Sequence, residues 1–269
     1  MLHTATIKAD QYSPFQSLPV WRSPSRLTVF CDFDGPIINV SDRYYQTYQL
    51  ALAEVQATYQ AQGVTLPIHL LTKEQFWQMK QNRVPDVEIA LRSGLQEAQM
   101  ALFMEGVTRI VNQPALLHQD TLQPGVRWAL ALLHAQGARL VLVTLRCQVQ
   151  AAQVLHGYGL LRLFSEIYGS QDEGAAYQNL ADHKTQLLRQ AIASSRSGDR
   201  AYDAAWMIGD TEADILAGQA TGIPTIALTC GIRSKSYLQR FTPTRIHSDL
   251  LSAAHYLVYS QENWAAVVA

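Results

Sequence analysis

A short apolar run ends in two aspartates within the stretch Val29-Phe30-Cys31-Asp32-Phe33-Asp34-Gly35-Pro36. Continuous apolar residues followed by a Gly-Pro turn are typical of a strand buried on both faces of a parallel sheet. In open α/β sheets, ligands bind at the edge where such strands have their carboxyl ends. Asp32 and Asp34 share one face of the chain, so we expect them near one small volume, where two like charges require a cation, a proton or both.

Three further strand-like runs precede polar side chains in a similar way. They are residues 140–144, which end in Thr144; residues 167–169, which lead through a polar loop to Lys184 at a helix start; and residues 205–208, which lead to Asp210 and Asp214. Each signal alone has an ordinary explanation, because Asp-Gly turns, strand-terminal threonines and helical lysines are often structural. Their occurrence in order along one chain favours a shared site.

These residues resemble the four motifs of the haloacid dehalogenase superfamily in its phosphatase type. The motifs are Asp32-Phe33-Asp34-Gly35, Thr144, Lys184 and Gly209-Asp210-Thr211-Glu212-Ala213-Asp214, and the match runs from about residue 27 to 232. The resemblance implies an α/β fold, with a Rossmann-like three-layer core, a mostly parallel sheet and an inserted helical cap. The expected boundaries are an N-terminal extension over residues 1–26, a core over residues 27–40 and 121–269, and a cap over residues 41–120.

The resemblance also implies a role for each motif residue. Asp32 is the expected nucleophile, which forms an aspartyl-phosphate, and Asp34 is the expected acid and base. Thr144 and Lys184 are expected to bind the phosphoryl oxygens. Phosphoryl transfer needs a nucleophile, a proton donor and positive charge, so the residue types agree with these roles. Mg²⁺ is the implied cofactor, a hard cation that prefers oxygen. Its expected ligands are Asp32, the backbone carbonyl of Asp34 and Asp210, with Asp214 either binding the ion directly or holding one of its ligands.

The acid at position 34 narrows the branch, because the dehalogenases and phosphonatases of the superfamily are expected to lack it. The prediction is a Mg²⁺-dependent phosphatase that hydrolyses a small phosphomonoester, similar to the phosphoglycolate phosphatase branch. Two alternatives stay open: a phosphomutase of the β-phosphoglucomutase type, and a non-catalytic binding or regulatory protein that retains the fold. Pro36 and Leu145 depart from the family's usual residues without removing a reacting group.

The segment between the first two motifs is predicted to be helical over residues 41–62, 72–81, 84–92 and 95–112. Lys80 and Arg83 in this insertion are candidate ligands for a distal anionic group of the substrate, and Arg92 is a weaker one. Phe76 or Trp77 is a candidate for the pocket wall. The competing interpretation is that the basic side chains face solvent and the aromatic ones fill the core of the insertion.

Strands and helices alternate after the insertion as far as Leu228, which predicts a mostly parallel sheet with helices on both faces. Residues 194–203 are rich in Ser, Arg and Gly and are expected to form an exposed loop.

Composition excludes several other classes of protein. The 269 residues suffice for one α/β core and a smaller insertion. A net charge of −1 gives no reason to expect nucleic acid as a partner. The three cysteines are too few and too scattered for a disulfide framework or a zinc site. Neither a signal-peptide core nor a membrane span is apparent, so we expect a cytoplasmic enzyme whose partner is a small phosphorylated metabolite.

Overall fold

The structure, a computed structural model, describes residues 27–172, 174–196 and 204–259. Six strands of this part form one sheet in the order β5-β4-β1-β6-β7-β8, and every neighbouring pair is parallel. The predicted α/β class with a mostly parallel sheet is therefore confirmed. The strands are β1 (Leu27–Cys31), β4 (Arg139–Cys147), β5 (Glu166–Ser170), β6 (Ala204–Gly209), β7 (Thr225–Leu228) and β8 (Arg245–His247).

Helices cover both faces of the sheet. Successive side chains of a strand point to opposite faces, and because apolar residues occupy both, each face has to be buried. In β1, Phe30 packs in one buried cluster with Leu188, whereas Val29 packs in a second cluster with Leu130 and Leu250. The first face is covered by α9 (Ala181–Arg196) and α10 (Glu212–Thr221). The second face is covered by α6 (Val126–Ala135), α7 (Gln148–Gly157) and α12 (Leu250–Tyr259).

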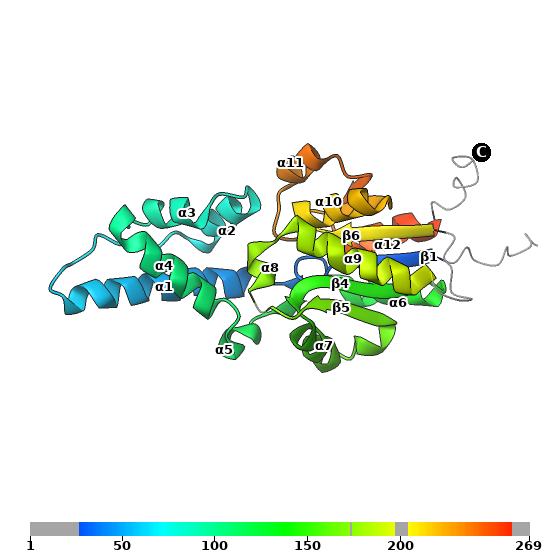
Figure 1. The fold of residues 1–269 in the computed structure, drawn as a ribbon, viewed down its shortest axis with the longest axis horizontal. Coiled ribbons are helices and arrows are strands. Elements are labelled where there is room, and N and C mark those ends of the chain that lie inside the picture. Colours follow the sequence, from blue (N-terminus) through cyan, green and yellow to red (C-terminus); the bar gives the residue numbers. More distant parts are fainter. Residues whose placement is uncertain (1–26, 173, 197–203, 260–269) are drawn as a thin grey trace, which may run out of the picture.

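A separate group of helices lies beside the sheet (Figure 1). They are α1 (Ser41–Ala61), α2 (Lys73–Gln81), α3 (Asp86–Arg92) and α4 (Glu97–Ile110), followed by the short α5 (Pro114–Leu117). The predicted helices are thus confirmed to within two residues at each end. The structure adds two strands that were not predicted, β2 (Ile38–Asn39) and β3 (Thr121–Leu122), which pair antiparallel where the chain enters and leaves this group.

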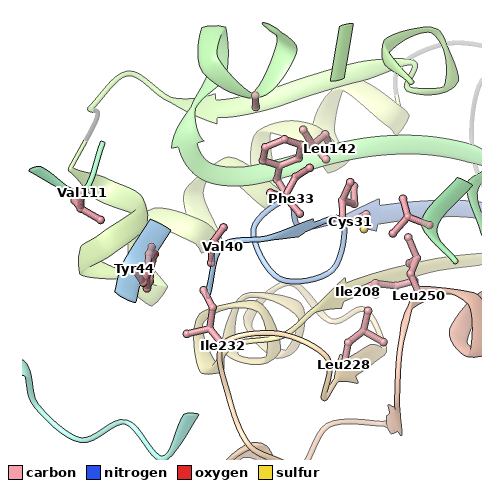
Figure 2. Close-up of a cluster of buried hydrophobic side chains, with 14 of the residues drawn as sticks. Cys31, Phe33, Val40, Tyr44, Val111, Leu142, Ile208, Leu228, Ile232 and Leu250 are labelled. Carbon is pink, nitrogen blue, oxygen red and sulfur yellow. The ribbon is translucent and has the colours of Figure 1, made fainter. Parts of the chain in front are cut away.

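Buried apolar side chains run without interruption from the sheet toward the separate helices. Figure 2 shows Cys31 and Leu142 of the sheet, then Val40 and Tyr44 near the start of α1. Cys31 is buried among apolar neighbours. The sheet and the start of α1 therefore share one core.

Two sequence-based predictions need correction. Residues 140–144 do not complete their strand, because β4 continues to Cys147 and its register against β5 shifts between Thr144 and Cys147. Residues 194–196 are the last turn of α9 rather than a loop, and the Ser195 side chain is buried. Residues 197–203 and the predicted extension over residues 1–26 lie outside the described residues.

In the described part of the chain, no helix combines the length and the apolar character needed to cross a membrane.

Candidate active site

Three carboxylates meet at the carboxyl ends of β1 and β6. Asp32 follows β1, and its N–H donates to the Ile208 carbonyl of β6 at 2.9 Å, so it lies beside Asp210, which follows β6. Asp214 stands in the first turn of α10. One oxygen from each of the three aspartates lies within 4.8 Å of the others, and all three residues are buried. The spacing of the two sequence motifs thus brings these side chains together, as predicted.

Two glycines make room for the Asp210 carboxylate. Gly35 has φ +100°, a conformation that favours glycine, and a Cβ atom there would lie 2.1 Å from Asp210 Oδ2. A Cβ atom on Gly231 would lie 2.0 Å from the same oxygen. Both distances are far below any van der Waals contact. The backbone therefore encloses Asp210 so closely that a side chain at either position would displace its carboxylate.

Asp214 is held by the start of its own helix. Its Oδ2 accepts the N–H groups of Asp210 at 3.2 Å and of Thr211 at 3.1 Å, together with the Thr211 hydroxyl at 2.8 Å. This is a capping box, in which the third helical residue returns to the residue that caps the helix. The second oxygen, Oδ1, is thereby directed at Lys184.

Lys184, in the first turn of α9, connects two of these carboxylates. Its Nζ lies 2.6 Å from Asp32 Oδ1 and 2.7 Å from Asp214 Oδ1, and its side chain is 2 % exposed. Burial by itself disfavours the ammonium form, but the charges of Asp214 and Asp32 outweigh it and raise the pKa of Lys184 above its usual value. The lysine is therefore a fixed positive charge beside Asp32.

One lysine does not balance three buried carboxylates. Burial raises the pKa of Asp32 to about 7, although Lys184 acts in the opposite direction. Burial, followed by the charges of Asp32 and Asp214, raises the pKa of Asp210 well above its ordinary value. The site thus has an excess of negative charge that favours a further cation or bound protons.

Oxygen ligands for a cation are present at this point. Asp210 Oδ2 accepts the Ile232 N–H at 2.5 Å, whereas the buried Oδ1 has no hydrogen-bond partner among the described residues. A buried unpaired carboxylate oxygen is costly unless it binds a cation or a proton. Carboxylates are the ligands that hard divalent cations prefer. The three aspartates therefore fit a divalent cation such as Mg²⁺.

Asp34 and Thr144 line the same pocket as Asp32 and Lys184. Thr144 is buried, and its hydroxyl accepts the Arg146 N–H at 3.1 Å. Asp34 is paired with Arg146, whose Nη2 lies 2.8 Å from Asp34 Oδ1. All four motifs of the sequence therefore reach one pocket. The arginine partner of Asp34 was not predicted.

Lys80 and Arg83, at the end of α2, also reach this pocket. Lys80 is buried, and its Nζ lies 2.8 Å from Asp86 Oδ1 and 3.2 Å from the hydroxyl of Tyr177, a residue of α8 (Ala175–Gln178). Burial lowers the pKa of Lys80, and Asp86 opposes that change. Arg83 is exposed, and its Nε lies 3.0 Å from Glu212 Oε1. Both basic side chains thus line the pocket, each with an acidic partner.

The other three candidates in the insertion, Arg92, Phe76 and Trp77, face solvent or pack in the core of the insertion instead of lining the pocket. Arg92 is exposed and pairs with Glu88 one turn away. Phe76 is buried and stacks on Tyr48 with ring centroids 5.0 Å apart, so it belongs to the core of the insertion. Neither Phe76 nor Trp77 lines the pocket that contains Asp32, because both pack against aromatic neighbours instead.

Arg233 is a pocket residue that was not predicted. Its Nε donates to Glu212 Oε2 at 2.9 Å, and its Nη1 donates to the Lys80 carbonyl at 3.2 Å. It therefore connects the loop after β7 with the end of α2. No local sequence pattern marks it, because its partners lie 21 and 153 positions away along the chain.

Comparison with known proteins identifies the family. Residues 29–228 match the haloacid dehalogenase-like hydrolases, and the chain belongs to that family. A probable phosphatase, IndB, of Dickeya dadantii (strain 3937) is 27% identical over 234 residues, which cover 86% of this chain and 94% of the relative. A phosphoglycolate phosphatase of Mesorhizobium japonicum is 30% identical over 131 residues, which cover 48% of this chain and 54% of that protein.

Solved structures agree on the fold. A haloacid dehalogenase-like hydrolase of Streptococcus pneumoniae superimposes with a TM-score of 0.62 at 22% identity, covering 87% of this chain and 99% of that one. A Clostridium difficile protein, named only provisionally as a phosphatase, superimposes with a TM-score of 0.65 at 18% identity, covering 87% of this chain and 99% of that one. The predicted superfamily and its hydrolase class are thus confirmed.

Proposed function

We propose that this hydrolase is a Mg²⁺-dependent phosphatase that cleaves a small phosphomonoester through an aspartyl-phosphate on Asp32. The observation that carries the proposal is the buried Asp32 carboxylate, which Lys184 holds beside Asp210 Oδ1, an oxygen with no hydrogen-bond partner in the described part of the chain. A nucleophile next to a fixed positive charge suits attack on an anionic phosphoryl group. Relatives named as phosphatases support the same class of reaction.

The reaction has two displacements at phosphorus. An oxygen of Asp32 bonds to phosphorus while the bond to the leaving oxygen breaks, and Asp34 gives its proton to that oxygen. In the second half, Asp34 takes a proton from water, the water oxygen bonds to phosphorus, and the bond from phosphorus to Asp32 breaks. Thr144 and Lys184 hold the phosphoryl oxygens during both steps.

The metal would be held by the side chains of Asp32, Asp210 and Asp214 and by the backbone carbonyl of Asp34. Bound Mg²⁺ supplies positive charge for the phosphoryl oxygens and offsets the excess negative charge of the aspartates. Lys184 shares this task, because it contacts two of the three carboxylates. In this proposal the positive charge of the site comes from two groups, the Lys184 ammonium and the bound metal ion.

Residues 41–120 are proposed as a cap on a core of residues 27–40 and 121–269. The support is that α1–α4 lie beside the sheet (Figure 1), while the end of α2 reaches the pocket. Lys80 and Arg83 are proposed as ligands for a second anionic group of the substrate, which suits a small phosphorylated metabolite. A cytoplasmic location stays a prediction.

A panel of phosphate esters tests the activity. Phosphate release is measured with Mg²⁺ for phosphoglycolate, sugar phosphates, nucleotides and an aryl phosphate, in the parent protein and in Asp32→Asn. Release by the parent and none by the variant supports the proposal. Sugar phosphate interconversion without phosphate release identifies a mutase instead. Absence of turnover by the parent on every ester favours a non-catalytic protein.

The covalent intermediate is tested directly by quenching the parent during turnover and reducing it with borohydride. Borohydride converts an acyl phosphate to an alcohol, so the peptide that contains Asp32 is expected to change mass. The same peptide from a sample quenched without substrate is the control. An unchanged peptide in an active enzyme overturns the assignment of Asp32 as the nucleophile.

A further inference from the structure

Asp34 belongs to a closed network of four buried charged side chains. Arg146 approaches both of its oxygens, with Nη2 at 2.8 Å from Oδ1 and Nε at 3.2 Å from Oδ2. Arg43 Nη2 lies 3.6 Å from Oδ2. Asp120 completes the network, because it accepts from Arg43 Nε at 2.9 Å and from Arg146 Nη2. The four side chains are each 8 % exposed or less.

The network is balanced in charge and anchored in the backbone. Two guanidinium groups face two carboxyl groups, so the charges sum to zero when Asp34 is ionised and to +1 when it carries the proton for the first displacement. Arg43 Nη1 also donates to the Val111 carbonyl at 2.9 Å. Arg146 lies over the Phe33 ring, with its guanidinium carbon 5.1 Å from the centroid. Balanced charges with several hydrogen bonds are the arrangement in which buried ions are tolerated.

The members come from four separate places in the chain. Asp34 follows β1 and Arg146 belongs to β4, whereas Arg43 is in the first turn of α1 and Asp120 directly precedes β3. Arg43 and Asp120 therefore stand at the two points where the chain passes between the sheet and the separate helices. Asp34 is therefore linked to both points, directly through Arg43 and, by way of Arg146, through Asp120.

We propose that Arg43, Arg146 and Asp120 are positioning residues for Asp34, which orient its carboxyl group for proton transfer to the leaving oxygen. This inference rests on the proposed function. Arg146 holds the Asp34 carboxyl group through one hydrogen bond, from Nε to Oδ2, and one ion-pair contact, from Nη2 to Oδ1. A carboxyl group has about four lone-pair sites, so a site is left for the substrate. The guanidinium group of Arg146 suits this positioning task, because its donors form a rigid planar fork that faces both oxygens of the carboxyl group.

The dependence of rate on the leaving group tests the proposal. Esters of acidic phenols need little protonation as they leave, whereas alkyl esters need a proton donor. In Asp120→Asn, kcat/KM for an alkyl phosphate is expected to fall about 100-fold, the lower end of a general-acid contribution. For p-nitrophenyl phosphate, we expect a fall of no more than about threefold. Arg146→Lys keeps the charge but loses the fork and is expected to show the same pattern.

Asp34→Asn separates a failure of this proposal from a failure of the proposed function. The first outcome is that Asp34→Asn lowers kcat/KM for the alkyl ester far more than for p-nitrophenyl phosphate, while Asp120→Asn lowers kcat/KM for both esters equally or for neither. The positioning role is then overturned and the acid role stands. If Asp34→Asn treats both esters alike, the acid role itself fails. Each of these outcomes is read from kcat/KM, which reports the first displacement only.

Loss of one buried charge can also destabilise the protein. The double variant Arg43→Gln/Asp120→Asn removes one charge of each sign and leaves Arg146 paired with Asp34. It is expected to fold and to show the same selective loss on alkyl esters. Arg92→Gln is the matched control, because it removes an exposed ion pair with Glu88 within α3, and neither residue contacts the network. Equal rates for both esters in the folded double variant overturn the proposal.

Discussion

Lys184 and Lys73 make lysine–aspartate pairs of the same length in opposite surroundings. Lys184 Nζ lies 2.6 Å from Asp32 and is buried, whereas Lys73 Nζ lies 2.6 Å from Asp42 at the surface. Burial determines how much each pair contributes to the free energy of unfolding, because water screens the charges of the exposed pair and does not screen those of the buried one. Removing Lys184 also leaves Asp214 without its cation.

Lys184→Met is therefore expected to abolish turnover and, in chelator, to lower the free energy of unfolding by about 3–5 kcal/mol. Lys73→Gln is the control, with an expected change of less than about 1 kcal/mol and parental turnover. Urea unfolding followed by circular dichroism measures both. Equal destabilisation by the two variants would contradict the assigned difference in environment.

Asp210 supplies a test of the metal that does not depend on turnover. If the three aspartates bind Mg²⁺, the ion stabilises the folded state by about 2.7 kcal/mol at a concentration 100 times Kd. Asp210→Asn is expected to lose this rise in thermal midpoint. Glu212→Gln is the matched control, because Glu212 is close in sequence but pairs with Arg233 and lies outside the cluster. A full Mg²⁺ shift in Asp210→Asn would exclude these aspartates as the ligands.

The residues that face the reacting groups could be predicted, but most of their partners could not. Asp32 and Asp210 closely follow apolar runs, which makes them candidates, and the resemblance to the superfamily's motifs implies their roles and that of Asp34. Arg146 follows such a run too, and because it is charged, hydropathy predicts that the strand ends at Thr144. A buried arginine is compatible with a strand when carboxylates neutralise it, and one of those, Asp120, is 26 residues away. A local hydropathy pattern does not predict contacts between residues that are so far apart in the sequence.

At the scale of elements, the end of α2 is attached to the loop after β7 by several bonds. The Ser234 N–H donates to the Gln81 carbonyl at 2.9 Å, and Arg233 donates to the Lys80 carbonyl at 3.2 Å. The same loop donates the Ile232 N–H to Asp210. One loop therefore contacts both the proposed cap and the proposed metal site.

Arg233→Met is expected to loosen this attachment. A hydrogen bond to a charged group contributes about 1.5–3 kcal/mol, which corresponds to roughly 10-fold to 100-fold in local opening. Amide exchange is expected to rise by that factor in residues 79–84 and to stay unchanged in β1. Lys235→Met is the control, because Lys235 lies two residues further on and is exposed. Unchanged exchange in residues 79–84 would show that Arg233 does not hold α2.

The long elements could be predicted because their signals are local. Thr72 forms a capping box at the start of α2, and Gly63 and Gly94 follow helices with φ of +78° and +93°. Most of the elements that were not predicted are short: β2 and β3 have two residues each, β8 has three and α8 has four. Two residues show no periodicity, so pairing across the chain alone determines such strands. The exception is α12, which has ten residues and lies beyond Leu228, where the predicted alternation of strands and helices stops.

At the scale of the whole molecule, the core is continuous. A single buried cluster includes Val29 and Leu142 of the sheet together with Leu52 of α1 and Phe103 of α4. The charged network of Asp34, described above, adds a second connection between the same two parts. A small domain with one shared core typically unfolds in a single cooperative transition.

The proposed cap and core are therefore expected to unfold in one cooperative transition. Amide exchange at increasing urea is expected to show α1, α4, β1 and β4 losing protection at the same concentration. Phe103→Ala lies in α4 alone, but its cost of about 3–5 kcal/mol is expected to lower the midpoint of the sheet as much as that of the helices. If the helices lost protection first, or if Phe103→Ala left the sheet unchanged, the two parts would be independent folding units, and the shared cluster would not couple them.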